Sequence, residues 1–177
     1  MRSRPVAQHL LEEALRAAAV DVDEAEVSLR GGASGWAQRA GGAPESGDVA
    51  LEQIVVRVLR DGRAATAVGA EMSVIAAREV AARARAALSA FPSDGPALED
   101  PASIASVDAW DEATARGHPL ERWVVAARVA RALDARGLDA EVRVATGRGG
   151  LHPSGALTAY AVANTRGLFA YHRSTWA

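Results

Sequence analysis

The chain has 177 residues, no cysteine, 49% hydrophobic residues and a formal net charge of −2. All 20 basic residues are arginine and are balanced by 22 acidic ones, so the composition argues against binding to nucleic acid. The lack of cysteine excludes disulfides, thiolate metal ligands and a cysteine nucleophile, and it fits cytoplasmic surroundings. Charged residues interrupt the amino-terminal apolar stretch, and no run of about 20 apolar residues could span a bilayer, so we expect neither a signal peptide nor a membrane partner.

A helix and two strands are predicted before residue 48. Residues 5–19 carry apolar side chains at spacings of three and four, as in an amphipathic helix. Residues 24–30 alternate apolar and polar, which predicts a half-buried strand that ends at the glycine pair 31–32. A weaker strand follows over 36–40, and the glycine-rich stretch 41–47 is expected to be a turn.

The clearest local signal is a β-hairpin centred on Asp61 and Gly62. Extended runs at 49–60 and 63–68 flank this dipeptide. Both central residues of such a turn need a positive φ, which glycine adopts without steric cost, so Asp61 and Gly62 are the turn-forming residues. Apolar residues fall on both faces of 49–60, so we expect that strand in the middle of its sheet.

Two further helices are predicted, over 73–90 and from Pro119 to about Gly137. A proline-rich connection, 91–118, separates them and is long enough to carry function. The side chains expected to face inward are Ile75, Ala82 and Leu88 in the first helix and Leu120, Trp123, Val124, Ala127 and Leu133 in the second.

Strands are predicted over 140–146, 156–163 and 168–176. Asn164 to Gly167 would form the turn between the last two, with Gly167 as a turn-forming residue. The glycine-rich stretch 147–150, which contains Arg148, follows a strand without opening a helix. It is therefore expected to be a contact loop and not a phosphate-binding loop.

A weak internal repeat relates residues 5–70 to residues 119–177, with 71–118 as a connecting helix and loop. In each half a helix is followed by an alternating strand and glycine-rich turns. Residues 1–177 are therefore predicted to form a single α+β domain of two α-β-β-β-like units. Its sheet would be mixed but largely antiparallel, with the helices packed on one face.

The order of these motifs resembles the amino-terminal domain of the TldD/PmbA family, whose members are named modulators of DNA gyrase and metallopeptidases. The resemblance covers nearly the whole chain and rests on several short motifs in a fixed order. They are Ala25-Glu26-Val27, Glu45-Ser46-Gly47, the hairpin from Val56 to Arg63, the alanine-rich helix after it, Asn164-Thr165-Arg166-Gly167, and Thr175.

This resemblance implies that a β-rich catalytic domain with a His-Glu-x-x-x-His zinc motif follows the amino-terminal domain. It also implies that family members pair to enclose a chamber in which peptides are cut. No His-Glu dipeptide occurs in this sequence. We therefore expect the metallopeptidase domain to be absent from this chain and zinc to be bound only by a catalytic domain or a partner subunit.

The residues themselves indicate no catalytic or metal site. His9, His118, His152 and His172 lack the paired spacing of zinc ligands. His152, His172 and Glu141 could form a surface metal site, but the interpretation that they are ordinary polar residues has more support. His118, Pro119 and Glu121 have the pattern of a helix start, and no serine or threonine lies in a nucleophile motif.

Contacts with a peptide or partner are expected at Trp110, Arg148, Asn164 and Trp176, because aromatic and arginine side chains are enriched at interfaces. The leading hypothesis is a non-catalytic peptide-binding or subunit-pairing module of a TldD/PmbA-type metallopeptidase complex. Its partners would be a TldD/PmbA-type subunit or catalytic domain and a peptide substrate. The alternative is part of an active zinc metallopeptidase, acting in proteolysis or peptide maturation, whose catalytic domain lies on another chain or is lost. A third hypothesis, direct action on gyrase or DNA, follows from the family name alone.

Overall fold

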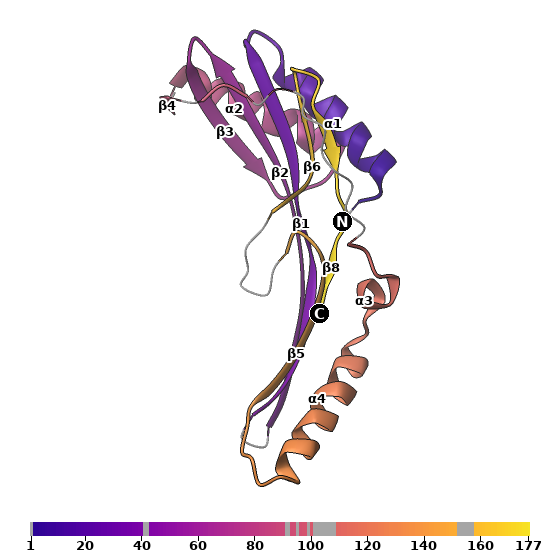
Figure 1. Cartoon of the computed structure of the whole chain (residues 1–177). Coiled ribbons are helices and arrows are strands. Elements are labelled where there is room, and N and C mark those ends of the chain that lie inside the picture. Colours follow the sequence, from indigo (N-terminus) through magenta and orange to yellow (C-terminus); the bar gives the residue numbers. More distant parts are fainter. Residues whose placement is uncertain are drawn as a thin grey trace. The chain divides into compact units, whose positions relative to one another are not determined.

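The computed structural model describes residues 2–40, 43–90, 93–94, 96–98, 100, 109–151 and 158–177 (Figure 1). The strands join in one sheet in the order β4-β3-β2-β1-β5-β8, and β6 pairs with β1 and β7. Every ladder given between named strands is antiparallel, and an isolated bridge between Ala109 and Ser174 is parallel. The predicted α+β class, with a mixed and largely antiparallel sheet, is confirmed. The described elements are α1 (Arg4–Ala18), β1 (Glu24–Ala40), β2 (Ala43–Arg60), β3 (Arg63–Gly69), α2 (Val74–Ala90), β4 (Ser93–Asp94), α3 (Glu112–Arg116), α4 (Pro119–Asp134), β5 (Val142–Gly149), β6 (Ala159–Asn164), β7 (Phe169–Tyr171) and β8 (Thr175–Trp176).

The chain divides into two compact units whose segments alternate along the sequence. Unit 1 comprises Met1–Gly31, Glu52–Val107 and Thr158–His172, and unit 2 comprises Gly32–Leu51, Asp108–Leu157 and Arg173–Ala177. Strands β1 and β2 contribute to both units.

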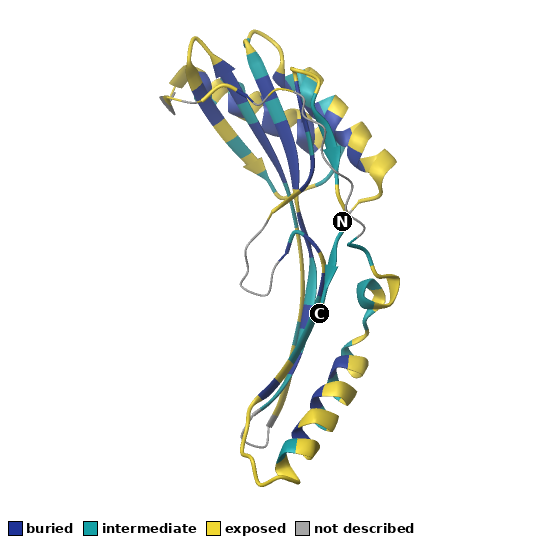
Figure 2. Cartoon of the chain, in the orientation of Figure 1, coloured by how far each residue is buried: buried dark blue, intermediate teal, exposed yellow. Residues whose placement is uncertain are grey.

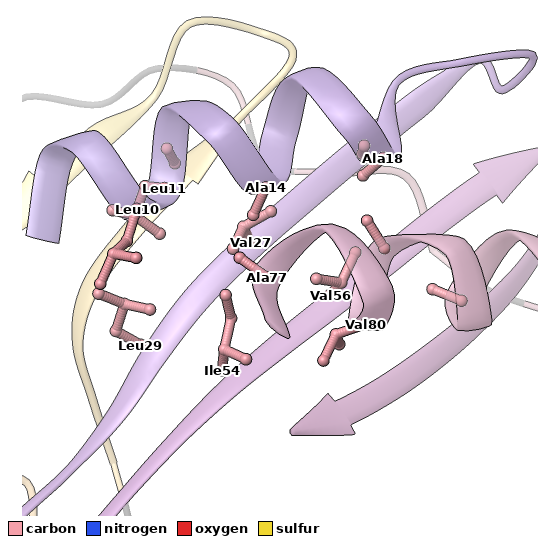
Figure 3. Close-up of a cluster of buried hydrophobic side chains, with 14 of the residues drawn as sticks. Leu10, Leu11, Ala14, Ala18, Val27, Leu29, Ile54, Val56, Ala77 and Val80 are labelled. Carbon is pink, nitrogen blue, oxygen red and sulfur yellow. The ribbon is translucent and has the colours of Figure 1, made fainter. Parts of the chain in front are cut away.

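The main hydrophobic core lies in unit 1, between one face of the sheet and the helices α1 and α2 (Figure 3). Small side chains such as Ala14 and Ala77, both 0% exposed, let the helices approach the sheet closely. The sheet supplies branched residues such as Val27, Val56 and Ile54 to the same core. Burial of these apolar side chains is the main force that holds α1 and α2 in place.

Strand β1 does not end at the glycine pair 31–32, so that prediction is wrong. Glu26 to Arg30 pair with β6, and Gly32 to Arg39 pair with β5. Gly31 lies at this change of partner with φ 130°, a value that other residues rarely adopt. The glycines allow the strand to change partners, and the predicted strand at 36–40 is the second part of β1.

Strand β2 begins earlier than predicted. Ala43 to Gly47 belong to the strand and not to a turn, and residues 41–42 of the predicted turn lie outside the described part. Between β3 and β1, β2 buries Val55, Val56 and Val58 on its two faces, as expected of a central strand. Asp61 and Gly62 join β2 to β3 with φ values of 53° and 73°, which suit a tight hairpin turn.

The helices begin close to their predicted starts, but their buried stripes differ from the prediction. Ile75 is 71% exposed, and Ala82 is exposed too, while Leu88 is buried. The alanine-rich sequence of α2 carries little periodic contrast, so packing selects the stripe of Ala77, Val80, Ala81, Ala84 and Leu88. Figure 2 shows the resulting bands of buried and exposed residues along the helices. None of the helices in the described ranges is long and apolar enough to cross a membrane.

The carboxy-terminal strands also differ from their predicted limits. Gly147 to Gly149 form the end of β5 and not a loop, because both neighbouring strands pair with them. The predicted strand 168–176 is divided into β7 and β8, with residues 172–174 between them. β7 pairs with β6 in unit 1, whereas β8 pairs with β5 in unit 2.

Candidate functional site

Unit 2 consists of a ribbon of strands with α4 packed on one face. Ala126, Ala130 and Val142 form its hydrophobic cluster, with Leu133 and Val144 against it. Leu120 and Val124, which were predicted to face inward, are 64% and 50% exposed. The ribbon is contacted by the helix side that carries Arg122, Ala126 and Ala130. The prediction is therefore wrong for Leu120 and Val124, whereas Leu133 packs inward as expected.

A buried arginine anchors α4 to the ribbon. The Arg122 side chain is 4% exposed and forms an ion pair with Asp48 of β2. Its Nη1 donates hydrogen bonds to the carbonyl oxygen of Gly117 at 3.1 Å and to Thr146 Oγ1 at 3.2 Å. A buried guanidinium needs such acceptors, because its transfer from water is costly.

Gly35 of β1 makes space for this cluster. A Cβ on Gly35 would overlap both Asp48 Oδ1 and Arg122 Nη2. Gly35 pairs with Thr146 in the ladder between β1 and β5, which places the Thr146 hydroxyl beside the guanidinium. Sequence analysis missed Arg122, although it lies on the same helical stripe as Ala126 and Ala130 and so carried a usable signal.

The start of α4 follows from its sequence. His118 is the N-cap residue, and its Nδ1 accepts a hydrogen bond from the backbone N–H of Leu120 at 3.2 Å. Glu121 completes a capping box by accepting the His118 N–H at 3.1 Å. These contacts set the first turn of the helix and so place Arg122. They also identify His118 as a capping residue.

The opposite face of the ribbon, which we call the platform face, carries aromatic and aliphatic side chains. Trp36 of β1 lies beside Gly47 of β2, where a Cβ would be 2.9 Å from the indole Nε1. The Arg143 guanidinium lies 4.8 Å from the Trp36 ring centre, within the range of a cation–π contact. Gly47 leaves room for the Trp36 indole close to the strands, and the Arg143 guanidinium packs over the ring.

Trp176 of β8 adds a second indole to the platform face. It pairs with Gly147, on which a Cβ would overlap the Trp176 ring. Gly147 also pairs with Ser34, two residues from Trp36, so both indoles lie on the same side of the ribbon. The Trp176 Nε1 donates a hydrogen bond to the Leu151 carbonyl at 3.1 Å, which holds the ring in place.

Two exposed aliphatic residues of β2 continue the platform face. Val49 and Leu51 share the side of Gly47, because side chains alternate along a strand, and each is 44% exposed. Among the described residues no helix packs on this face. The two faces of the ribbon thus differ: one carries α4 and the buried Arg122, and the other presents Trp36, Val49, Leu51 and Trp176.

Three of the four predicted contact residues gather around Thr175 in unit 2. Arg148 pairs with Thr175 in the ladder between β5 and β8, next to Trp176. Trp110 lies next to Asp111, whose N–H donates a hydrogen bond to Thr175 Oγ1 at 2.9 Å. The Trp110 Nε1 donates a hydrogen bond to Glu112 at 2.8 Å, and this is the main cause of the lowered pKa of Glu112.

The fourth predicted contact residue, Asn164, lies in unit 1 and is 2% exposed. Its Oδ1 accepts the backbone N–H groups of Arg166 and Leu168, each at 3.0 Å. Gly167, the predicted turn-forming residue, has φ 92° in this turn. The Asn-Thr-x-Gly sequence therefore contains the polar groups that hold the turn between β6 and β7.

A short acidic and basic network surrounds the same turn. Arg166 Nε donates to Glu24 Oε1 at 2.7 Å, and its Nη1 donates to Asp100 at 2.7 Å. The Leu98 N–H donates to Glu24 Oε2 at 2.9 Å. This backbone bond, followed by the bond from Arg166, lowers the pKa of Glu24.

The described residues do not fit a zinc ion. Among them no three of the His, Asp and Glu side chains are grouped as metal ligands. His9 lies in α1 and His118 caps α4, while His172 follows β7. His152 lies outside the described residues, so the metal site with Glu141 and His172 that was considered from the sequence cannot be assembled from them.

Several solved structures share this fold. TldE from Thermococcus kodakarensis matches 96% of this chain with a TM-score of 0.70 and 15% identity. Proposed modulators of DNA gyrase from Bacteroides thetaiotaomicron and Thermotoga maritima match 98% and 97% of it, with TM-scores of 0.65 and 0.67 and identities of 17% and 13%.

The chain spans 37–39% of the length of these three structures. No protein-family model matches the sequence, and no curated protein does. At such low identity the likeness concerns the fold. The resemblance to the TldD/PmbA family, inferred from the order of short motifs, is thereby confirmed at the level of the fold of this chain.

Proposed function

We propose that this chain is a non-catalytic module that binds a partner polypeptide within a TldD/PmbA-type metallopeptidase complex. The observation that carries the proposal is the platform face of unit 2. Exposed Val49 and Leu51 share this face with the half-buried Trp36 and Trp176. Aromatic residues are enriched at protein interfaces, and contiguous apolar surface is costly to leave in water.

The construction of the platform face favours a polypeptide ligand over a small molecule. Gly47 and Gly147 let the indoles of Trp36 and Trp176 lie close to the backbone of the strands. Small-molecule sites are usually concave and enclose most of the ligand, whereas protein partners bury flat surfaces. The partner we propose is a TldD/PmbA-type subunit or catalytic domain, and a peptide substrate could use the same face.

Binding to a catalytic subunit tests the proposal directly. The probe is a TldD/PmbA-type protein that carries the His-Glu-x-x-x-His motif and is encoded in the same genome. We expect saturable binding by calorimetry, weakened at least tenfold by the double change Val49→Lys and Leu51→Lys. Burying two ammonium groups in an apolar contact costs more than the 1.4 kcal/mol that corresponds to tenfold.

Matched controls come from exposed valines elsewhere. Val124→Lys on α4 and Val68→Lys on β3 change residues that are 50% and 48% exposed, and both should leave the affinity unchanged. Equal binding by the platform variant and the controls would overturn the assignment of this face.

The alternative is that the chain is part of an active zinc metallopeptidase whose catalytic domain lies on another chain or is lost. The greater length of the three matching structures favours this candidate. Since the described residues do not fit zinc, the ion would be bound elsewhere. Stoichiometric zinc and peptide cleavage by this chain alone would reject the non-catalytic proposal. Cleavage that appears only when the catalytic subunit is added would support it.

A further inference from the structure

A cavity in unit 1 lies between the turn after α1, the end of β2 and the last turns of α2, and its volume is about 260 Å³. Arg60 and Arg85 contribute its basic groups, and Asp21 and Ser89 contribute a carboxylate and a hydroxyl. The rest of the wall is apolar and consists of Val20, Val22, Ala86 and Leu88. The cavity therefore combines a charged part with an aliphatic part.

The turn after α1 holds one of the two arginines at the wall. Asp21 lies in this turn in the left-handed conformation, with φ 56°, which aspartate tolerates better than most residues. Its carbonyl oxygen accepts a hydrogen bond from Arg60 Nη1 at 3.2 Å. The Arg60 guanidinium forms no ion pair and no second hydrogen bond with the described residues, so its other N–H groups are available to a ligand.

Arg85 is half-buried and its guanidinium has no acceptor among the described residues. Its Nε is buried without a hydrogen-bond partner there, which leaves Nη1 and Nη2 as the groups that can reach a ligand in the cavity. A partly buried guanidinium without an acceptor is costly. An anion in the cavity would supply the missing acceptors, and a carboxylate matches the paired N–H groups of arginine in geometry.

The charges around the cavity favour a ligand with a single negative charge. Arg60, Arg85 and Asp21 together carry one excess positive charge. The helices α1 and α2 both end close by, at Ala18 and Ala90, and the C-terminal end of a helix carries a partial negative charge. A monoanion balances the excess charge. A dianion such as phosphate would leave negative charge beside Asp21 and the two helix ends.

The aliphatic wall and the small volume favour a short apolar group on the same ligand. Sites for drug-sized molecules usually measure about 300–1,000 Å³, so this cavity suits a smaller one. We propose that it binds a small aliphatic acid whose carboxylate pairs with Arg85 and Arg60 and whose hydrocarbon part contacts Val22 and Leu88. The site lies in unit 1 and the platform face in unit 2, so neither proposal depends on the other.

Titration of the full ¹⁵N-labelled chain with sodium butyrate, followed by NMR, tests the proposal. We expect saturable shifts of the backbone amides of Asp21 and Ser89 and of the Arg85 Nε–H. Butyramide has nearly the same shape without the charge and should bind about tenfold more weakly, and inorganic phosphate should also bind more weakly than butyrate. Equal binding of butyramide, or tighter binding of phosphate, would overturn the assignment.

Two variants with opposite expected effects locate the site. Arg85→Gln should keep the circular dichroism spectrum and bind butyrate about tenfold more weakly. Asp21→Asn keeps the size of the side chain and suits the left-handed turn, and it removes a repelling charge, so it should bind butyrate more tightly. Arg128→Gln changes an exposed arginine of α4 and is the matched control, with unchanged affinity. Unchanged affinity of Arg85→Gln, or weaker binding by Asp21→Asn, would overturn the proposal.

A free peptide carboxy terminus is a second source of the same carboxylate chemistry. The dipeptide acetyl-Ala-Val, with a free carboxylate, and its amide distinguish the two sources. Tighter binding of the peptide acid than of butyrate supports the carboxylate site and assigns it to polypeptide ends. Weaker binding of the peptide acid supports a site for free small acids. Equal binding of the peptide acid and its amide would overturn carboxylate recognition.

Discussion

Arg122 of α4 and Asp48 of β2 form an ion pair in which the arginine is 4% exposed and the aspartate 56% exposed. The arginine is therefore the buried member of this ion pair. Arg122 is the one charged residue in the buried set of the described residues, and its Nε lacks a hydrogen-bond partner there. Asp48 thus supplies the negative charge that makes burial of the guanidinium tolerable.

Removing Asp48 should destabilise the chain through the charge that remains. Asp48→Asn leaves Arg122 buried without a counter-ion, and we expect a loss of about 1–3 kcal/mol in the free energy of unfolding by urea titration. In an Arg122→Met background the same change should cost less than about 0.5 kcal/mol, because no buried charge is left. Additive effects of the two changes would contradict this coupling.

Gly35→Ala should disturb the same cluster by its volume. The added methyl group would overlap Asp48 Oδ1 and Arg122 Nη2, so the ion pair must move. Overpacking of this kind should lower the free energy of unfolding, measured by urea titration, by about 1–3 kcal/mol. Most of the loss should disappear when Arg122 and Asp48 are both alanine, and an unchanged loss in that background would show that the strand itself rejects alanine.

Gly62→Ala should destabilise the hairpin for a purely conformational reason. Gly62 has φ 73°, and no atom lies within 4 Å of an added Cβ, so there is no clash to relieve. The left-handed conformation costs a non-glycine residue about 1–2 kcal/mol, which should appear as a lower urea midpoint. Gly62→Asn should lose less, because asparagine tolerates this conformation better. Equal losses for alanine and asparagine would argue against backbone conformation as the cause.

Asn164→Ala should destabilise the turn between β6 and β7. The Asn164 Oδ1 accepts two backbone N–H groups in a setting where the residue is 2% exposed. Loss of both bonds should cost about 2 kcal/mol in urea unfolding. Asn164→Asp keeps the acceptor and should cost less at neutral pH. If both variants lose the same stability, the acceptor role assigned to Asn164 is wrong.

The network at Glu24 predicts a loss of stability in acid. The Leu98 N–H and then Arg166 lower the pKa of Glu24 below its usual value of 4.5. A carboxyl whose folded pKa is lowered stabilises the fold above its unfolded pKa, and this contribution disappears as the pH falls through the folded pKa. When the pH is lowered from 7, the melting temperature should therefore begin to decrease at about pH 4.5.

Glu24→Gln is the matched control for this pH dependence. The variant should melt at a lower temperature than the unchanged chain at pH 7, and the two should converge in acid. Parallel pH profiles would show that Glu24 does not contribute to the acid sensitivity.

Local chemistry explains which parts of the fold were predictable. The Asp61-Gly62 turn, the starts of the helices and the central position of β2 depend on residues adjacent in sequence, and the structure contains all three. The limits of β1, β2 and β5 were misjudged because glycine pairs usually interrupt strands. Here they accommodate an exchange of partners and the packing of indole rings.

The candidate site was predictable only in part for a related reason. Trp110, Arg148 and Trp176 are distinctive residues, and all three lie in unit 2. Whether they contact a partner remains a prediction. Arg122 escaped notice because arginine is usually exposed, and Val49 and Leu51 because apolar residues of a central strand are usually buried.

The amino-acid sequence by itself determined the α+β class, the hairpin at Asp61 and Gly62, and an order of motifs that resembles one family, since all of these follow from local periodicity and turn chemistry. The tertiary structure decided which strands pair with each part of β1, which side of α4 is buried, and which face of the ribbon is left without a helix among the described residues. These outcomes depend on contacts between residues far apart in the chain, where the volumes of glycine, alanine and tryptophan and the compensation of one buried charge outweigh local preference.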